Sequence, residues 1–562
     1  MGRLFLLFCF SLSTLVAQTQ YPEDHFVKPL KIPLILSGTF GELRSNHFHS
    51  GLDIKTQQRE GLNVHSSAEG YVSRIKISHW GYGKALYITH PNGYTSVYAH
   101  LKKFAPKIEA YVKKHQYEKE SFTIHLFPEA NDLLVEKDEV VAYSGNSGGS
   151  GGPHLHFEIR DGNSKPINPM LFGIEIPDTK VPEIRAGLVY SFGDSSHVNQ
   201  SNKPLELRII KKTNGTLTTN RIEAYGTIGF GINVVDKQDG ALNNNGIFSL
   251  EMAVNGIKVY KHIVDTYAFS ETRYLNTFID YERFYRKRQR VQKCFVEPAN
   301  KLSIYKNLRN KGYLQVKDSL SYTVKITAKD FKGNTRSLII PVKGKKDSVL
   351  VKKKIKWTPH YFRANEFNKI TRDNVTVAFP KLSFYKNLYF DFDYKDSIVS
   401  LHDQSVPLHK NFTLTFDISN YPKENRTQLF IARKNYKGKL YYTNTRRKED
   451  RLYTLSKTLG DYTIALDTIK PKITPLNFKN DQLLTKYRYL KFRVSDNLSG
   501  VKSYRGEIDG KWILLEFDAK KGLLTYDFND TSLIGTKHTL KVTAIDNVNN
   551  TNTYIATFYK KE

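Results

Sequence analysis

Five residues of the chain are of types that bind a divalent metal or carry out proton transfer. His49 and Asp53 lie four residues apart, His154 and His156 lie two apart, and His100 ends a strand-like segment. Zinc binds histidine nitrogen and carboxylate oxygen, and a catalytic zinc site has three protein ligands and one open position. These residue types are therefore candidates for a catalytic metal centre.

The spacing of His154 and His156 predicts that both imidazoles lie on the same face of a strand. The next residues, 157–159, have a strand-like pattern, and residues two apart in a strand point to the same side. A glycine-rich segment, 145–153, comes directly before His154. Such a loop lets the backbone approach an extended peptide, although the composition is also typical of a flexible linker. A single histidine in a strand is usually a core or surface residue, so it is the combination that favours a site.

Short strands separated by turns must position these residues. The alternation of apolar residues predicts strands at Tyr71–Ser78, Lys84–His90, Thr95–Leu101, Val140–Ser144 and His154–Arg160. Pro91-Asn92-Gly93 separates two of them, and Asn-Gly between alternating runs is typical of a hairpin. We therefore expect an antiparallel meander.

One segment interrupts this pattern. Pro106–Glu120 has apolar residues at helical spacing, and Ser121–Phe127 alternates like a strand. Its position between His100 and the His154–Arg160 strand predicts that it borders the site as a wall or a lid. The alternative is a packing element that lies away from the site.

The chain behind residue 175 is also β-like and contains an internal repeat. The segment 178–184 recurs as 467–473, and each begins with Asp-Thr and has Pro two residues before its final Ile. The segment 324–330, followed by Gly-Asn-Thr, recurs as 540–546, followed by Asn-Asn-Thr. Alternating apolar residues before an Asp/Asn turn suit the last strand pair of a β-sandwich, and they resemble immunoglobulin-like modules.

These patterns predict a mainly β chain with several domains. The expected ranges are a signal peptide at 1–17, a first domain at 18–175, an immunoglobulin-like domain at 176–345, a β-rich domain at 346–465 and a C-terminal immunoglobulin-like domain at 466–562. A basic stretch, 343–354, is expected to link the second and third domains. The third domain has no motif that suggests a function.

The first residues predict export. Arg3 precedes an apolar stretch that ends near Leu15, and Ala17 offers a cleavage site before Gln18. The stretch is shorter than the ~20 apolar residues of a spanning helix, so we expect no transmembrane segment after cleavage. Cleavage also removes Cys9, which leaves Cys294 as an ordinary buried thiol and excludes an internal disulfide.

The chain is strongly basic. It carries 85 Lys+Arg and 55 Asp+Glu, a net charge of +30, and losing Arg3 with the signal peptide would leave about +29. This charge favours an anionic partner, although it is equally consistent with solvated surface charge. An exported chain rarely meets nucleic acid, so we expect the cell wall or anionic lipid head groups instead.

The metal-binding residues and their surroundings resemble the M23 (lysostaphin/LytM-like) zinc metallopeptidases. The resemblance rests on His49-x-x-x-Asp53, Tyr98-Ala99-His100 and His154-Leu155-His156-Phe157, with the glycine-rich lead-in, and it covers about 40–170. It implies that His49, Asp53 and His156 bind one Zn²⁺ and that His100 and His154 are catalytic. His47 is a weaker competitor, because only His49 has an Asp at the motif spacing, and His90 matches a position that is usually structural.

The resemblance implies a zinc-dependent metalloendopeptidase that hydrolyses peptide bonds of bacterial peptidoglycan, in a cross-link or a stem peptide, by zinc-activated water. The expected location is the periplasm or cell envelope of a bacterium. Relatives that have lost ligands act as regulators, so a catalytically silent protein that binds the wall or another hydrolase is the alternative. A protease that acts on proteins is a third hypothesis. The β domains could also contact an envelope protein.

Overall fold

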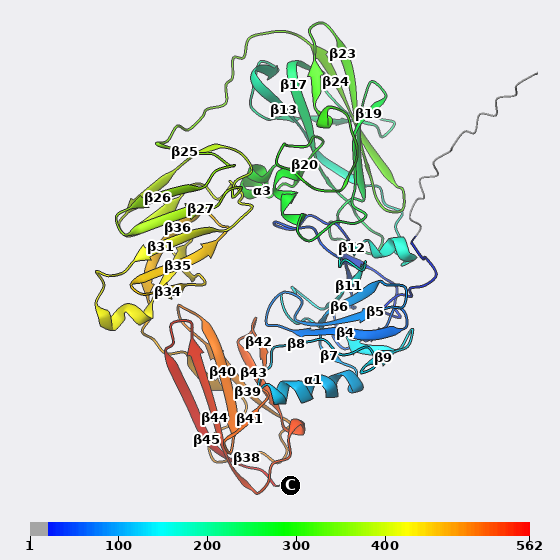
Figure 1. Ribbon diagram of the computed structural model, residues 1–562. Helices are drawn as coiled ribbons and strands as arrows, with labels where there is room; N and C mark the ends of the chain where they lie inside the picture. The colour runs from blue at the N-terminus through cyan, green and yellow to red at the C-terminus, as the bar shows by residue number, and fades with distance from the viewer. Residues whose placement is uncertain (1–20, 562) are drawn as a thin grey trace, which may run out of the picture.

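The computed structural model describes residues 21–561, so the expected signal peptide lies outside the described residues. The chain is mainly β, and its strands form four units around a ring (Figure 1). We call them the N-terminal unit (β1–β12), the second unit (β13–β24), the third unit (β25–β36) and the C-terminal unit (β37–β45). In the described part of the chain, no helix combines the length and apolar character needed to cross a membrane.

The main sheet of the N-terminal unit has the order β1-β2-β11-β6-β5-β4-β8. Its strands are β1 (Leu36–Gly38), β2 (Leu52–Lys55), β4 (Gly70–Ile77), β5 (Lys84–Thr89), β6 (Thr95–Leu101), β8 (Ile124–Leu126) and β11 (His154–Arg160), with β9 (Leu134–Val135) on β4 and β12 (Pro166–Ile167) on β11. The predicted strands are confirmed to within about one residue, and β4-β5-β6 is the expected meander. The meander does not continue, because β11 lies between β2 and β6.

The predicted strand at Val140–Ser144 belongs to a different sheet. It forms β10 (Val140–Tyr143) and lies between β3 (Asn63–His65) and β7 (Lys103–Phe104). The helix α1 (Pro106–Glu118) begins directly after β7, with a proline in its first turn, where a missing N–H costs no hydrogen bond. A short 3₁₀ turn, Pro169–Phe172, ends the unit.

The strand β11 separates two kinds of side chain. Leu155, Phe157 and Ile159 are completely buried in the core, where each contributes about 1.5–3 kcal/mol of stability. The alternate residues from His154 to Arg160 face the other side of the sheet. Gly51 lets the preceding loop approach this strand, because a Cβ there would lie 2.3 Å from the Phe157 carbonyl oxygen. Burial of the apolar side chains thus holds β11 in place, and with it the polar side chains on the other face.

The other three units are also built from β-sheets. The second unit holds β13 (Glu183–Val198), β14 (Leu205–Leu207), β15 (Ile209–Lys211), β16 (Leu217–Thr219), β17 (Ile222–Val235), β18 (Ser249–Val254), β19 (Ile257–Ile263), β20 (Val291–Lys293), β21 (Tyr305–Leu308), β22 (Leu314–Val316), β23 (Ser321–Lys329) and β24 (Thr335–Gly344), with helices α2 (Leu275–Phe278) and α3 (Tyr281–Lys287). The buried thiol of Cys294 lies in its core, as expected.

The third unit consists of two five-stranded sheets and one strand pair. Its strands are β25 (His360–Phe362), β26 (Asn368–Arg372), β27 (Val375–Phe379), β28 (Leu388–Phe390), β29 (Phe392–Lys395), β30 (Ile398–Leu401), β31 (Phe412–Asp417), β32 (Leu429–Lys434), β33 (Leu440–Tyr442), β34 (Arg446–Lys448), β35 (Arg451–Ser456) and β36 (Gly460–Leu466).

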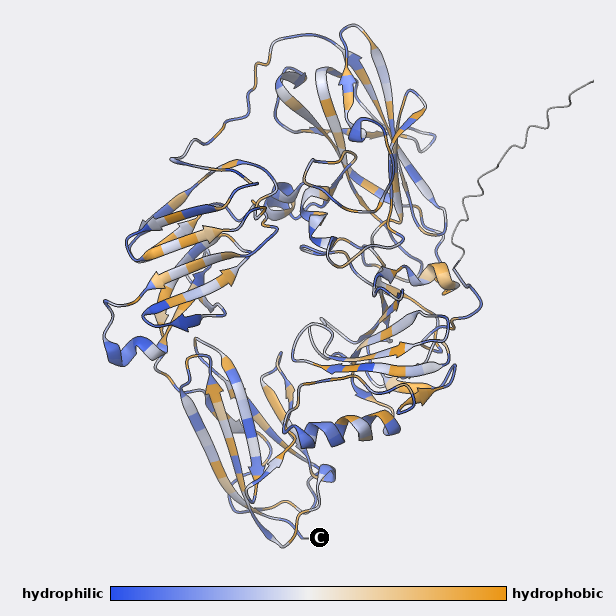
Figure 2. Cartoon of the chain, viewed as in Figure 1, coloured by the Kyte–Doolittle hydropathy of each residue, from blue (hydrophilic) through white to orange (hydrophobic). Residues whose placement is uncertain are grey.

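The C-terminal unit has a four-stranded and a five-stranded sheet. Its strands are β37 (Lys472–Pro475), β38 (Gln482–Leu483), β39 (Tyr489–Ser495), β40 (Val501–Ile508), β41 (Lys511–Ile513), β42 (Glu516–Asp518), β43 (Leu523–Asp527), β44 (Lys537–Asp546) and β45 (Thr551–Tyr559). In the middle of β44, from Leu540 to Ala544, apolar residues alternate with polar ones, in agreement with the alternating burial (Figure 2). The repeat had predicted paired last strands, and β23–β24 and β44–β45 are antiparallel pairs.

The inserted segment does not cover the site as a lid. Strand β8 pairs with β4, at the opposite end of the main sheet from β2 and β11. Helix α1 lies beside the C-terminal unit (Figure 1), where Lys113 forms an ion pair with Asp530 and the Tyr117 ring is 5.1 Å from that of Trp512. The segment therefore joins the two ends of the chain and does not form a lid over β2 and β11.

Candidate active site

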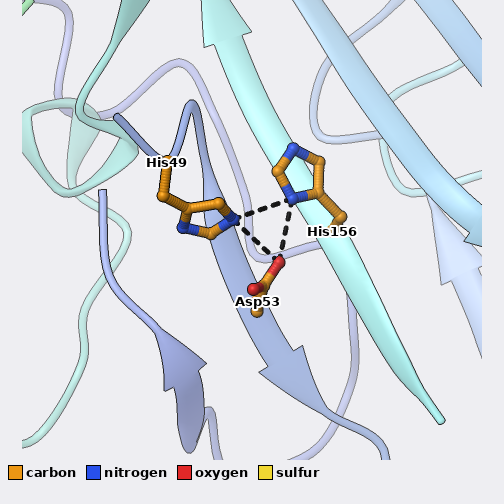
Figure 3. A group of neighbouring side chains, drawn as sticks. All are labelled: His49, Asp53 and His156. Atoms are coloured by element: carbon orange, nitrogen blue, oxygen red, sulfur yellow. Dashed lines mark hydrogen bonds and ion pairs between the residues drawn. The ribbon is translucent and has the colours of Figure 1, made fainter. Parts of the chain in front are cut away.

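Three side chains, two from the neighbouring strands β2 and β11 and one from the loop before β2, converge on one point (Figure 3). His49 Nε2, Asp53 Oδ1 and His156 Nδ1 lie 2.9–3.1 Å from one another. The pairing of β2 with β11 produces this arrangement, because Asp53 is directly opposite His156 in the register. His49 comes from the loop before β2, and all three side chains are buried.

The outer nitrogen of each imidazole has its own acceptor. His49 Nδ1 lies 2.8 Å from the Thr39 carbonyl oxygen, and His156 Nε2 lies 2.7 Å from Glu158 Oε1. When both outer nitrogens donate a proton, the two inner nitrogens face each other as lone pairs with the Asp53 carboxylate. Ligands of a tetrahedral zinc are about 3.3 Å apart, given Zn–N distances of ~2.0–2.1 Å. The donor set thus fits a zinc ion in chemistry and spacing.

Electrostatics around the site also favour a cation. Burial raises the pKa of Asp53, but the imidazoles of His49, His154 and His156 outweigh this effect and hold it well below its usual range. Burial lowers the pKa of His156, yet hydrogen bonds to Asp53 and Glu158 raise it to about 9. The second oxygen of Asp53, Oδ2, accepts a hydrogen bond of 2.8 Å from Arg44. The carboxylate is therefore ionised and held in place.

Glu158 contacts this group and was not singled out by the sequence reasoning. Its side chain is completely buried and accepts hydrogen bonds from Ser50 Oγ at 2.7 Å and from Arg160 Nε at 2.6 Å, besides contacts with Tyr82 and His156. Burial raises its pKa, but Arg160 and His156 outweigh this and keep it well below the usual range. The available signal was the spacing of two residues that continues from His154 and His156 to Glu158 along one strand face.

His100 and His154 lie beside the three convergent atoms. Their rings are 4.7 Å apart, and the His100 ring is 5.9 Å from that of His156. His154 Nε2 approaches Asp53 Oδ1 to 3.4 Å. The Nδ1 atoms lie 2.9 Å from carbonyl oxygens, of Ser147 for His100 and of Gly152 for His154. Each Nδ1–H can therefore donate outward and leave Nε2 free to accept a proton.

His100 occupies a strained position. Its φ of 59° is in the left-handed region, which costs a non-glycine residue on the order of 1–3 kcal/mol. Its backbone is held by the Tyr82 carbonyl oxygen, which accepts from His100 N at 3.0 Å, and by the bond of its ring to Ser147. Burial lowers the pKa of His100 to about 3, so its imidazole is neutral. Strain of this kind often accompanies a functional position.

The C-terminal unit reaches the glycine-rich loop. Lys520 Nζ donates to the Asn146 carbonyl oxygen and, at 3.0 Å, to that of Ser150. Lys84, which follows the turn against this loop, forms a 3.0 Å ion pair with Glu516 of the same unit. A pocket of about 230 Å³ lies between the two units, and Phe122 of the inserted segment is part of its wall. The loop that precedes His154 is thus supported from a unit more than 350 residues away in the chain.

The remaining histidines of this unit do not join the group. His47 is exposed and makes no contact with the three convergent atoms. His90 is buried and bonded to the Glu69 carbonyl oxygen and Ser96 Oγ, which agrees with the expected structural role. His65 Nδ1 lies 2.8 Å from the Asp138 carbonyl oxygen.

Comparison with known proteins identifies the unit that carries this site. Residues 47–117 match the model of peptidase family M23. The N-terminal unit is an M23 peptidase domain. Residues 359–467 match the Zu5-like domain, which corresponds to the third unit, for which the sequence had suggested no function.

Relatives of the M23 domain include named peptidases. The chain is 32% identical over 136 residues to the DD-carboxypeptidase/endopeptidase Mpg of Neisseria meningitidis, a match that covers 24% of this chain and 25% of that protein. It is 27% identical to the peptidoglycan DD-endopeptidase ShyB of Vibrio cholerae, over 28% of this chain and 30% of that protein. The match thus spans between a quarter and a third of these relatives.

Solved structures of M23 proteins are similar to part of the chain. The catalytic domain of the prophage-encoded M23 protein EnpA from Enterococcus faecalis has 22% identity and a TM-score of 0.20, over 27% of this chain and 98% of that one.

Proposed function

We propose that the chain is a zinc-dependent metalloendopeptidase that hydrolyses peptide bonds of bacterial peptidoglycan, in a cross-link or a stem peptide. The observation that carries the proposal is the convergence of His49 Nε2, Asp53 Oδ1 and His156 Nδ1, with His100 and His154 beside them. The M23 match supports a peptidase, and the names of two relatives support peptidoglycan as the substrate.

The residues around the site have distinct roles in this proposal. His49, Asp53 and His156 hold one Zn²⁺, and the chemistry that the ion supplies when bound is Lewis acidity. His154 and His100 each present Nε2 toward the site, because Nδ1 donates to a backbone carbonyl. One of them accepts the proton of the attacking water, and the other stabilises the oxyanion that forms on the substrate.

The net charge of the chain suits an enzyme of the cell envelope. A net charge of +30 favours association with anionic wall polymers, and peptidoglycan lies outside the inner membrane. The proposed location is the periplasm or cell envelope, with peptidoglycan peptides as the substrate.

Digestion of purified sacculi tests this proposal. The full chain should release soluble muropeptides whose masses identify the bond that is cut, and the Asp53→Ala variant should release none. His47→Ala is the matched control, because His47 is exposed and outside the group, and it should digest sacculi like the parent. A zinc-loaded, folded parent protein that releases nothing while still binding sacculi would instead support a silent wall-binding protein.

A further inference from the structure

Three aspartates come together outside the M23 domain. Asp178, Asp236 and Asp330 each offer one carboxylate oxygen, and these atoms lie within 4.8 Å of one another. Asp178 lies in the connection between the M23 domain and β13, Asp236 directly follows β17, and Asp330 directly follows β23. The cluster is therefore at the end of the second unit where the chain enters it.

Asp236 faces this cluster without a partner of its own. Asp236 is only 2% exposed. Within residues 21–561, no group donates a hydrogen bond to its Oδ1 atom. Asp330 is 1% exposed. Among the described residues, none of the three aspartates forms an ion pair with a lysine, arginine or histidine, although the chain has 85 Lys+Arg. Buried carboxylates are ordinarily paired with a cation or coordinate a metal.

Neighbouring groups hold the carboxylates in orientation. Asp330 Oδ1 accepts from Gly333 N at 2.7 Å and from Asn334 N at 2.8 Å. The Asn334 side chain donates to Asp330 Oδ2 at 2.7 Å and to the Asp178 carbonyl oxygen at 3.2 Å. Through Asn334, these bonds fix Asp330 relative to Asp178 without the help of an ion.

A small cavity lies at the same place. It has a volume of about 20 Å³, which suffices for one water-sized particle. Its wall includes Asp178 and Asp236 from this cluster and Thr39 and Asn168 from the M23 domain. The cluster thus borders the junction between the two units.

We propose that Asp178, Asp236 and Asp330 bind one Ca²⁺ ion. The donors are all oxygens, which suits calcium or magnesium better than zinc. Two ligands on opposite sides of Ca²⁺ are about 4.6–5.2 Å apart, since Ca–O distances are ~2.3–2.6 Å, and the separations in the cluster fit this limit. The ion fastens the connection 173–182 to the ends of β17 and β23, and so fixes the second unit against the M23 domain.

The other copy of the sequence repeat builds the same arrangement. Asp467, Asp496 and Asp546 also bring their carboxylates within 4.8 Å, and Asp496 Oδ1 again has no partner in the described chain. Asn550 donates to Asp546 Oδ2 at 2.7 Å and to the Asp467 carbonyl oxygen at 2.8 Å, as Asn334 does in the first copy. The recurrence in the second and C-terminal units indicates that the geometry belongs to the repeat and is not an accident of one loop.

Calcium binding by the full chain tests the proposal. Equilibrium dialysis with radioactive Ca²⁺ should show one equivalent less per chain for Asp236→Asn than for the parent. Asp194→Asn is the matched control, since it removes an exposed carboxylate of the same unit, and it should bind as the parent does. Equal binding by Asp236→Asn and the parent would overturn the assignment, as would equal competition by Mg²⁺.

The temperature of thermal unfolding provides a second measurement that does not depend on dialysis. Without Ca²⁺, Asp236→Asn should unfold at a higher temperature than the parent, because it removes repulsion between buried carboxylates. With saturating Ca²⁺ the order should reverse, because only the parent gains binding free energy. An order that does not change with Ca²⁺ would contradict the proposed site.

Discussion

Glu158 lies on the far side of the His156 ring from Nδ1, the atom of His156 that faces His49 and Asp53. Its Oε1 is 2.7 Å from His156 Nε2, while His156 Nδ1 on the other side of the ring is 2.9 Å from Asp53 Oδ1. A carboxylate in this position fixes the ring orientation and makes the inner nitrogen a better ligand. We regard Glu158 as a positioning residue that acts through His156.

Removing the charge of Glu158 should weaken zinc binding. Glu158→Gln keeps the shape of the side chain, and we expect the zinc affinity to fall by ~10–100-fold, as for other outer partners of metal ligands. Competition with a zinc-binding dye measures the affinity, and circular dichroism monitors the fold. Glu136→Gln, at an exposed position of the same unit, should have the parent's affinity. If Glu158→Gln binds zinc as tightly as the parent, Glu158 only fills the core.

Single substitutions should distinguish the proposed ligands His49 and Asp53 from the nearby His47. His49→Ala and Asp53→Ala should each lose bound zinc and cleavage, because two ligands rarely retain a structural or catalytic zinc ion. His47→Ala should keep about one zinc per chain and full activity. Metal content by mass spectrometry and digestion of sacculi provide the two measurements. Full activity of either ligand variant would disprove the assignment.

Local patterns in the sequence were sufficient to predict the strands that carry the candidate site. The alternation in 154–160 predicted β11 with its observed ends, and the helical spacing from Pro106 predicted α1 to within two residues. Both signals depend only on neighbours along the chain. The group of His49, Asp53 and His156 could be named because the resemblance to M23 peptidases implied this set, and its role as a metal site stays a prediction.

Long-range pairing could not be predicted in the same way. The insertion of β11 between β2 and β6 depends on contacts between residues about 60 to 100 positions apart, and β10 pairs in a separate sheet although its pattern resembles the others. The partner of α1 is more than 380 residues away, so nothing near Lys113 indicates Asp530. Glu158 was overlooked because a charged residue in an alternating strand usually faces solvent.

The two remaining histidines should affect rate without affecting metal content. His100→Ala and His154→Ala should keep zinc and lose ~10²–10⁴-fold in the rate of cleavage, the usual contribution of a positioned acid or base. Loss of zinc from either variant would make that residue a ligand and change the proposed roles. Unchanged rates in both would exclude the mechanism, while leaving the metal site itself intact.

The ion pair between Lys113 and Asp530 should hold the C-terminal unit against the M23 domain. The Asp530 side chain is only 4% exposed, while that of Lys113 is 34% exposed, so a single change leaves a nearly buried charge without its partner. Lys113→Asp places two carboxylates together, and we expect the ring of four units to open, with a larger radius of gyration in small-angle X-ray scattering. The double variant Lys113→Asp/Asp530→Lys restores opposite charges and should return the radius to that of the parent. Lys114→Asp is the control, because Lys114 on the same helix pairs only with Glu118 of α1 among the described residues. A Lys113→Asp chain as compact as the parent would mean that the other contacts, such as the Lys84–Glu516 ion pair and Tyr117 with Trp512, are sufficient to hold the two units together.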